Sequence, residues 1–183
     1  MCIRDRILAS LPNSTLMTIS GKWQYVDDGT GNYQMAQTRI DSNYATMVQK
    51  GVVVGNGTIQ TDFKLTADTD DAYLYFGLDD NLNGFAAKVT RTNSTTATLY
   101  LYKAALGQQT GSYLGTYYTF NNFDTTRFHT LKIEVNGTSI KVYLDNFTDY
   151  NVIQYTNTTA VSGYIGIGTY ALAAAACFDN FGP

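Results

Sequence analysis

The sequence predicts an all-β protein, an antiparallel β-sandwich, on three observations. Tyr and Phe account for 15 and 9 of the 183 residues, and these aromatic types fit the half-buried surface of a strand. Glutamate, a good helix former, occurs once, at Glu134. Sixteen glycines against two prolines are typical of many tight turns between short strands. The length suits one domain with its own core, which we expect to span residues 21–183.

Strand patterns follow one another at short spacing from residue 21 onward. The first covers residues 21–26 and leads into a polar, glycine-containing turn. Further short strands are expected, in order, at 33–37, 44–48, 52–54, 58–65 and 72–78. In the last of these, Leu74 and Phe76 alternate with Tyr73 and Tyr75, so the two pairs face opposite sides of a sheet.

The dipeptide Asn136-Gly137 lies between two alternating runs and predicts a two-residue hairpin turn of type I′, in which both residues take positive φ. Such a loop pairs Ile133 with Ile140 and Leu131 with Val142. Together with Leu144 these residues are expected to be buried. Turn chemistry and hydrophobic pattern therefore indicate the same strand register.

The polar side of this hairpin is expected to face solvent. In the predicted register Lys132 lies opposite Lys141, and Glu134 lies on the diagonal to Lys141, where it relieves the like-charge contact. Beyond the hairpin, strands are expected at 163–168 and at the C-terminal end, up to residue 181. About a dozen short strands without a confident helix or repeat indicate a sandwich or jelly roll.

Charge and hydropathy exclude two classes of partner. The net charge is −3 and the basic residues are scattered, so no cluster is present to neutralise nucleic-acid phosphates. No apolar run reaches the roughly 18 residues of a membrane span. We therefore expect neither nucleic-acid binding nor a membrane span.

Residues 1–20 are expected to be a leader outside the sandwich. The first six residues, MCIRDR, look like the in-frame translation of a sequencing adapter, so we expect that Met1 is not the native start and that a signal peptide is missing upstream. Cys2 then leaves the cysteine count, and Cys177 is expected to be a small buried hydrophobic residue. Apolar residues within 7–20 offer a segment for self-association by strand addition.

Several phrases in fixed order carry a resemblance to a known family. They are GKW at 21–23, GTIQTDFKL at 57–65, YFGLDDNLNGF at 75–85, FHTLKIEVNG at 128–137, GYIGI at 163–167 and FDNF at 178–181. The ordered set resembles the laminin-G-like branch of the concanavalin A-like lectin/glucanase superfamily. The resemblance implies a jelly roll of two antiparallel sheets. It also implies a secreted or cell-surface protein, because relatives are often appended to glycan-degrading enzymes or adhesins.

The residues that a glycosidase of that superfamily needs are missing. Its members carry a Glu-x-Asp-x-x-Glu or similar motif, and a chain with Glu134 as its single glutamate cannot contain it. Pairs of aspartates occur in turn-like contexts, where Asp is favoured for backbone reasons. The single histidine, His129, lies on the apolar side of a strand and is expected to be a core or rim residue. We therefore expect no enzyme activity.

A set of tyrosines with partly exposed rings is expected to form a ligand-binding surface. Strand parity places Tyr73, Tyr75, Tyr100 and Tyr102 opposite the core, with Lys88 on the same side, and Tyr143 and Tyr164 extend the set. Flat rings stack on sugar faces, while phenol hydroxyls and an ammonium group hydrogen-bond sugar hydroxyls. Two alternatives stay open, since tyrosine also suits any half-exposed strand and aromatic surfaces also mark protein interfaces.

The resemblance also implies a structural calcium ion, the one cofactor expected. Relatives often hold Ca²⁺ with an aspartate of the C-terminal strand, a position that Asp179 matches, and the loop of Asp27 and Asp28 is expected to approach it. The alternative is that Asp179 caps a turn.

The leading hypothesis is a non-catalytic, extracellular module for binding polysaccharide or other glycans, or for adhesion. The alternative is a structural subunit of an extracellular filament, adhesin or phage-like appendage, assembled through residues 7–20.

Overall fold

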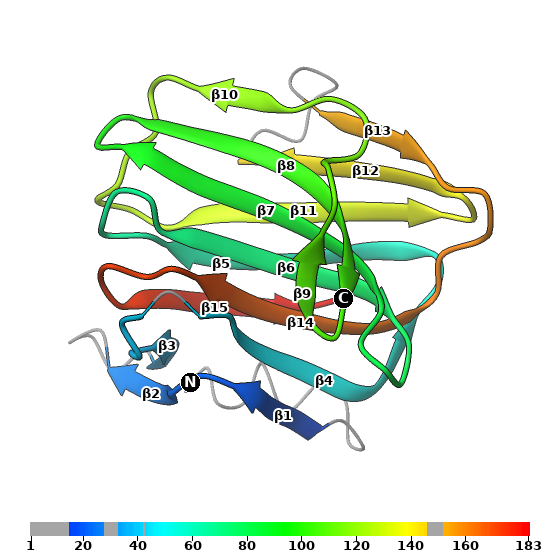
Figure 1. Cartoon of the computed structure of the whole chain (residues 1–183), viewed down its shortest axis with the longest axis horizontal. Helices are drawn as coiled ribbons and strands as arrows, with labels where there is room; N and C mark the ends of the chain where they lie inside the picture. Colours follow the sequence, from blue (N-terminus) through cyan, green and yellow to red (C-terminus); the bar gives the residue numbers. More distant parts are fainter. Residues whose placement is uncertain (1–14, 28–32, 42, 146–151) are drawn as a thin grey trace.

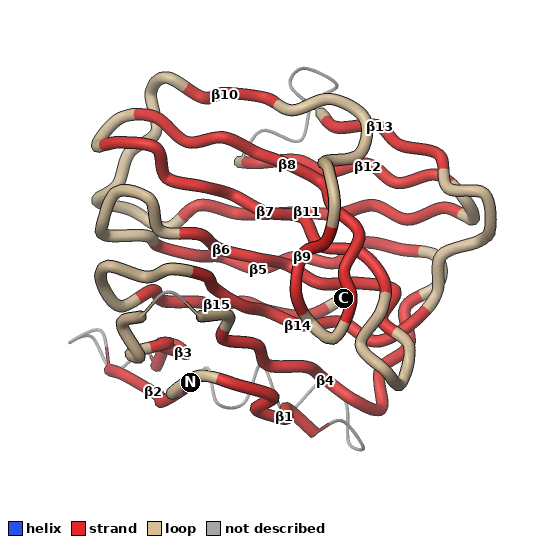
Figure 2. Tube along the Cα trace, viewed as in Figure 1, coloured by secondary structure: helices blue, strands red, loops and turns tan. Residues whose placement is uncertain are grey.

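Two antiparallel sheets pack face to face in the computed structural model, which describes residues 15–27, 33–41, 43–145 and 152–183 (Figure 1). Within these ranges strands alternate with turns and loops, and no helix is present (Figure 2). The predicted all-β jelly-roll sandwich is thereby confirmed. Since these ranges hold no helix, they hold no helix that could span a membrane.

Eight strands form the sheet that faces the viewer in Figure 1. Their order is β1 (Thr15–Ser20), β4 (Ala45–Val54), β14 (Gly163–Tyr170), β6 (Asp71–Leu78), β7 (Gly84–Asn93), β8 (Thr96–Ala105) and β10 (Tyr118–Phe120), with β9 (Gln108–Thr110) paired to β8.

Seven strands form the sheet behind it. Their order is β13 (Ile153–Thr156), β12 (Ser139–Leu144), β11 (His129–Asn136), β5 (Gly57–Lys64), β15 (Ala176–Gly182), β3 (Tyr33–Gln37) and β2 (Trp23–Asp27).

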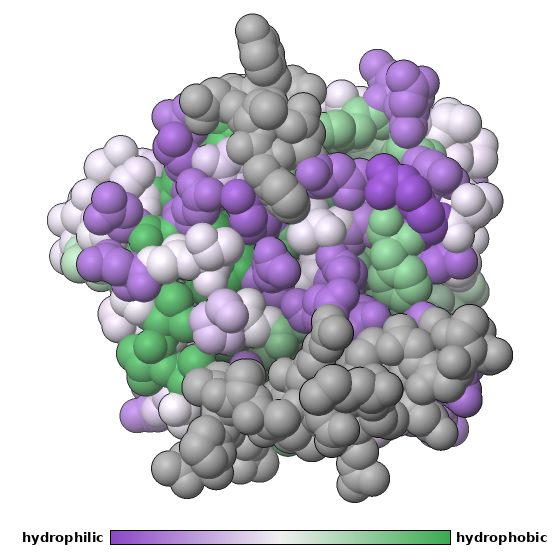
Figure 3. Space-filling model, turned by 180° about the vertical axis from the view of Figure 1, so that it is seen from behind, coloured by the Kyte–Doolittle hydropathy of each residue, from purple (hydrophilic) through white to green (hydrophobic). Residues whose placement is uncertain are grey.

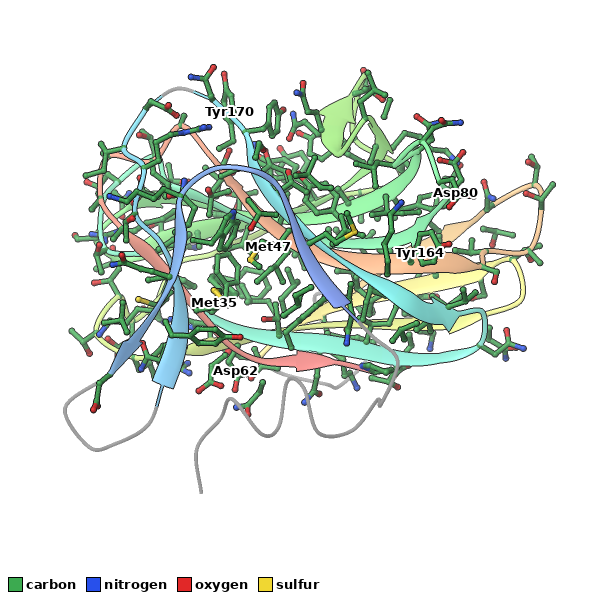
Figure 4. The ribbon with its side chains drawn as sticks, turned by 90° about the horizontal axis from the view of Figure 1, so that it is seen from below. Met35, Met47, Asp62, Asp80, Tyr164 and Tyr170 are labelled. Atoms are coloured by element: carbon green, nitrogen blue, oxygen red, sulfur yellow. The ribbon has the colours of Figure 1, made fainter. Side chains whose placement is uncertain are left out.

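The main core lies between the sheets and follows the alternation of the strands. Leu74 and Phe76 of β6 point into it, as do Ile59 and Phe63 of β5, and all four are at most 1% exposed. Met35 and Met47 also lie between the two layers (Figure 4). Each large apolar side chain buried in this way contributes about 1.5–3 kcal/mol relative to leaving it in water.

The hairpin of β11 and β12 corrects the predicted register. Its two-residue loop is Gly137-Thr138, and the pairs are Leu131 with Leu144, Ile133 with Val142, Val135 with Ile140 and Asn136 with Ser139. Only the first loop residue has a positive φ, 60° at Gly137, which fits a type II′ turn in place of the predicted type I′. The predicted pairing was therefore wrong by two residues.

A shift of two residues leaves every side chain on its predicted face. Leu131, Ile133, Ile140, Val142 and Leu144 are all buried, so that part of the prediction is confirmed.

The observed register also gives better charge pairing. Glu134 lies opposite Lys141, whereas the predicted register placed Lys132 opposite Lys141. Outside the hairpin, the Asn56 side-chain oxygen accepts a hydrogen bond from the backbone amide of Gly137 at 2.7 Å. Unlike charges and this hydrogen bond explain why the loop lies one residue further along the chain.

Between β1 and β2 the chain passes from the edge of the eight-stranded sheet to the edge of the seven-stranded sheet. Gly21 has φ 95°, and a Cβ at this position would meet that of Ala45 at 2.5 Å, so only glycine fits the crossing. Just beyond it, the indole N–H of Trp23 donates to the backbone carbonyl of Ser20 at 2.8 Å, and its ring lies 5.9 Å from that of Phe178. Trp23 thus ties the two edge strands to the core.

A hairpin arm stands over the outer face of the eight-stranded sheet. It consists of the end of β8, the turn 106–107 and β9, and Figure 1 shows it crossing in front of the sheet. The backbone amide of Gly107 donates to the carbonyl of Leu82 at 3.0 Å, and the Thr46 hydroxyl donates to the carbonyl of Gly107 at 3.0 Å. These two bonds fasten the arm to the sheet and to the loop after β6.

Candidate functional site

Strand parity places the predicted tyrosines of β6 on the outer face of the eight-stranded sheet, as expected. Tyr73 and Tyr75 are stacked, with ring centroids 5.6 Å apart and planes at 8°. Both are 0% exposed, so the expectation that their rings are partly exposed was wrong. Burial strongly raises the pKa of both phenols, because it disfavours the phenolate.

A small second core on the outside of the sheet explains this burial. It comprises Val48, Leu78, Ala86 and Ala104 around the two tyrosines, with Tyr44, Leu82, Tyr164 and Tyr170 packed at its border. The Tyr44 ring lies 5.9 Å from that of Tyr73 and 4.5 Å from that of Tyr170. Parity predicts the face of a side chain, but it contains no information about a hairpin arm and a loop tyrosine that fold over that face.

Lys88 lies in the middle of a row of directly opposed residues across three strands. Tyr73 of β6 faces Lys88 of β7, which faces Tyr100 of β8. The ammonium nitrogen is 5.7 Å from the ring centroid of Tyr73 and 5.8 Å from those of Tyr100 and Tyr102. Cations over ring faces at this separation are attracted by the ring quadrupole. The structure therefore brings Lys88 together with three of the predicted tyrosines.

An almost fully buried carboxylate accompanies the lysine. Asp71 Oδ2 lies 3.0 Å from Lys88 Nζ and accepts a hydrogen bond from the Tyr73 hydroxyl at 3.3 Å, while Asp71 Oδ1 accepts one from the Thr90 hydroxyl at 2.6 Å. Burial raises the pKa of Asp71, and Lys88 opposes that shift. Both oxygens of this carboxylate are thus engaged within the protein.

Gln109 of the arm joins the tyrosines to one another. Its side-chain oxygen lies 2.9 Å from the Tyr73 hydroxyl and shares that group's one proton with Asp71. Its side chain also interacts with the hydroxyl of Tyr102, where it opposes the effect of burial on the pKa. Its backbone interacts with the hydroxyl of Tyr44 and opposes the effect of burial on the pKa of that phenol. Burial raises the pKa of both Tyr44 and Tyr102. The arm therefore fixes the orientation of these three phenols.

Two exposed tyrosines in the loop between β9 and β10 complete the site and were missed by the sequence analysis. Tyr113 and Tyr117 are 43% and 48% exposed, and their centroids lie 6.0 and 5.7 Å from that of Tyr100. They contact each other edge to face at 5.3 Å and 81°. No alternation marks them, since residues 111–117 are loop (Figure 2), and their only signal is tyrosine among glycines.

We call this set the tyrosine cluster. Its members are Tyr44, Tyr73, Tyr100, Tyr102, Tyr113, Tyr117 and Tyr170, with Asp71, Lys88 and Gln109. It combines exposed ring faces with an ammonium group and phenol hydroxyls, the groups that stack on and hydrogen-bond sugars.

The two tyrosines predicted to extend the set lie outside the tyrosine cluster. Tyr143 belongs to the seven-stranded sheet; it is 3% exposed, donates to Glu134 Oε2 at 3.0 Å and carries Lys132 Nζ 4.6 Å from its ring centroid. Tyr164 shares the outer face of the eight-stranded sheet, but donates to Asp80 at 3.1 Å at the end of the face opposite Tyr170 (Figure 4). The structure therefore does not bring either residue into the tyrosine cluster.

Within the tyrosine cluster Asp71 is the one carboxylate, and both Glu134 and Asp80 lie far from it. The single glutamate, Glu134, lies on the other sheet, where Lys132 Nζ contacts it at 2.8 Å; that bond outweighs desolvation and lowers the pKa of Glu134. Asp71 begins β6 and Leu78 ends it, so these two residues lie roughly 23 Å apart at about 3.3 Å per residue, and Asp80 follows Leu78 in the next loop. Paired glycosidase carboxyls lie about 5–9.5 Å apart.

His129 is buried, as the sequence analysis expected. Its Nδ1 lies 2.7 Å from Asp145 Oδ2 and its Nε2 lies 2.6 Å from the carbonyl of Asp124, and its ring stacks on Phe123 at 3.8 Å. A hollow of about 330 Å³ adjoins it. Both ring nitrogens therefore hold loops and strand ends together.

The predicted metal ligands are only partly placed. Asp179 of β15 lies opposite Asp62 of β5, and Asn180 bridges them through its backbone N–H to Asp179 Oδ1 and its Nδ2 to Asp62 Oδ2, each at 2.6 Å. Asp27 ends β2, with β3 between it and β15, and Asp28 lies outside the described residues.

The described residues supply few ligands for the predicted calcium ion. They hold no group of three carboxylate, His or Cys side chains that could bind a metal ion, and the carboxylate oxygens named above already accept protein N–H groups. Calcium prefers six to eight oxygen ligands. Calcium binding at Asp179 therefore stays a prediction.

Comparisons with known proteins agree with the fold. No protein-family model and no curated protein matches the sequence. Among solved structures, the carbohydrate-binding module CBM66 from Bacillus subtilis is 22% identical, with a TM-score of 0.69, covering 92% of this chain and 95% of that chain.

Two further neighbours are an endo-glucanase and a Ca²⁺-bound domain. A glycoside hydrolase family 16 endo-glucanase from Bacteroides ovatus is 12% identical, with a TM-score of 0.62 and coverage of 91% and 92%. The Ca²⁺-bound exoplasmic/lumenal domain of VIP36 is 11% identical, with a TM-score of 0.58 and coverage of 96% and 86%. The chain has the jelly-roll fold that the carbohydrate-binding module, the endo-glucanase and the VIP36 domain share; the laminin-G-like branch is not distinguished.

Proposed function

We propose that this protein is a non-catalytic, extracellular carbohydrate-binding module whose ligand binds to the tyrosine cluster. The observation that carries the proposal is the convergence of Tyr100, Tyr113 and Tyr117 beside Lys88 on one sheet face. The buried part of the cluster holds the ammonium group and phenols in place before a ligand arrives. Such pre-organisation lowers the ordering cost of binding.

The same geometry supports a role in binding without bond cleavage. Asp71 is the carboxylate within the cluster, and its oxygens already accept from Lys88, Tyr73 and Thr90. Asp80 and Glu134 are too distant to act with it on one glycosidic bond. The fold neighbours include glucanases, so this part of the proposal rests on the side chains and not on the fold.

Replacement of one stacking ring tests the proposal. Tyr100→Ala is expected to weaken binding to a retained polysaccharide by about 1–3 kcal/mol, roughly 5- to 150-fold, because one aromatic contact is removed. Affinity gel electrophoresis against a panel of soluble polysaccharides, followed by calorimetry, measures the change.

Tyr25→Ala is the matched control, since Tyr25 is 41% exposed on β2, at the edge of the other sheet. Equal losses in the two variants, or no retention of the wild type by any polysaccharide, would reject the tyrosine cluster as the binding site.

A structural subunit remains the second candidate, because β1 is an edge strand of the eight-stranded sheet and exposes Met17 (42%) and Ile19 (40%). Edge strands with apolar side chains invite pairing with another chain. Residues 7–14 of the predicted assembly segment lie outside the described residues. A concentration-dependent increase in size on gel filtration that disappears in Met17→Lys/Ile19→Lys would favour this candidate.

A further inference from the structure

We infer that the tyrosine cluster selects uncharged polysaccharides and rejects those bearing carboxylate or sulfate groups, an inference that rests on the proposed binding function. The first observation concerns the cation in the cluster. Lys88 has a side chain only 13% exposed and lies 3.0 Å from a carboxylate whose side chain is 5% exposed, so the charge that a polyanion would seek is already neutralised inside the protein.

The neutralising carboxylate is itself held in place. Asp71 accepts hydrogen bonds from Thr90 and Tyr73 in addition to its contact with Lys88. Turning Lys88 toward an anionic ligand would therefore leave Asp71 as a buried, uncompensated charge, which is costly. The ion pair remains intact most cheaply when the ligand brings no charge of its own.

Other described cations near this face are also engaged. Arg39 lies beside Tyr44, whose carbonyl it contacts at 3.0 Å, and its Nε is 2.8 Å from Asp41. Lys50 lies over the ring of Tyr164, 5.6 Å from its centroid, at the far end of the face. Neither side chain presents an uncompensated cation to the exposed rings of Tyr113 and Tyr117.

The rings themselves favour a neutral ligand. Aromatic faces carry the negative part of the ring quadrupole, so they attract the C–H groups of a sugar and repel an anionic substituent. The whole protein adds a long-range term of the same sign, since its net charge is −3. The rings, the ion pair and the net charge thus all disfavour an anionic ligand. The hydroxyl groups of a neutral sugar match the remaining hydrogen-bond donors of Lys88 and the phenols.

Matched pairs of polymers test the inference. Hydroxyethylcellulose is compared with carboxymethylcellulose, and laminarin with its sulfated derivative, by affinity gel electrophoresis and calorimetry of the wild type. We expect retention by a neutral member only, with an affinity that changes less than about twofold between roughly 50 and 500 mM NaCl, because screening acts on net charges. Binding to a charged member alone, falling as salt rises, would overturn the inference and leave the proposed function standing.

A charge-switch variant sharpens the test. Asp71→Asn keeps the shape of the side chain but leaves Lys88 uncompensated, so it is expected to gain about tenfold in affinity for carboxymethylcellulose at low salt and to lose that gain at high salt. The double variant Asp71→Asn/Lys88→Gln restores neutrality and should gain nothing. If Asp71→Asn does not fold, the wild-type salt profile decides alone, and failure to bind any polymer of either kind would reject the binding function together with this inference.

Discussion

The outer faces of the two sheets carry similar residue types but differ in structure. The face of the seven-stranded sheet carries Lys132, Glu134, Lys141 and Tyr143 in a row of paired charges, and hydrophilic residues gather across it (Figure 3). The face of the eight-stranded sheet also carries tyrosines and a lysine, but an arm and loops cover it and make a second core. Alternation in a strand decides which residues point outward. Segments outside the strand decide whether an outward-pointing side chain is exposed to solvent.

The largest loss of stability is expected for a substitution at the centre of the covered face of the eight-stranded sheet. Tyr75→Ala is expected to destabilise the protein by about 3–5 kcal/mol, the range for removing a fully buried aromatic ring. Chemical denaturation followed by circular dichroism measures the free energy of unfolding. Tyr25→Ala, on the exposed edge of the other sheet, is expected to cost about 1 kcal/mol or less. Similar values for the two variants would mean that the second core contributes little.

The next prediction compares the stability lost when the ion pair of each face is broken. Lys88→Met leaves Asp71 uncompensated, with a side chain 5% exposed, and is expected to cost about 3 kcal/mol. On the other face, Lys132→Met removes a partner of Glu134, whose side chain is 40% exposed, and is expected to cost about 0.5 kcal/mol. Unfolding by urea in both variants gives the two numbers, and a larger loss in Lys132→Met would contradict the proposed difference between the faces.

The smallest expected effect is on stability at acid pH, because the pKa values of two aspartates are shifted in opposite directions. Burial alone raises the pKa of Asp145, but hydrogen bonds from His129, Thr130 and Arg127 outweigh it and lower the pKa below 3.8; its contribution to stability is therefore present above that pH and is lost as the pH falls. Burial raises the pKa of Asp71 above 3.8, so its contribution is present below that pH and is lost as the pH rises.

Unfolding free energies between about pH 3 and pH 7 are expected to show this difference. Asp145→Asn should reduce the loss of stability that occurs as the pH falls. Asp71→Asn should reduce the loss of stability that occurs as the pH rises. Equal slopes in the two variants and the wild type would show that neither group is linked to folding.

The sandwich and its core could be predicted because period-two alternation is a local signal in the sequence. The face on which Tyr73, Tyr100 and Lys88 lie could be predicted for the same reason. Tyr113 and Tyr117 could not, because they lie in a loop, and the burial of Tyr73 and Tyr75 could not, because their cover comes from Tyr44 and the arm. Tyr143 was grouped with the others by parity alone, which does not say in which sheet a strand lies.

The hairpin teaches the same lesson at a smaller scale. The apolar pattern is satisfied by the predicted register and by the observed one, since they differ by two residues. The choice between them depends on Glu134 facing Lys141 and on Asn56 bonding to Gly137, a residue 81 positions away. A contact over that separation leaves no mark in the local sequence.

The position of Trp23 provides a spectroscopic separation of folding from binding. It is the single tryptophan of the chain, and it is hydrogen-bonded to Ser20 and packed near Phe178 at the edge of the seven-stranded sheet. Its emission therefore reports the docking of the N-terminal strands. Tyrosine absorbance, in contrast, comes from many rings, seven of which belong to the cluster. A ligand that perturbs the tyrosine difference spectrum and leaves the indole emission unchanged can thus be followed in solution without any label.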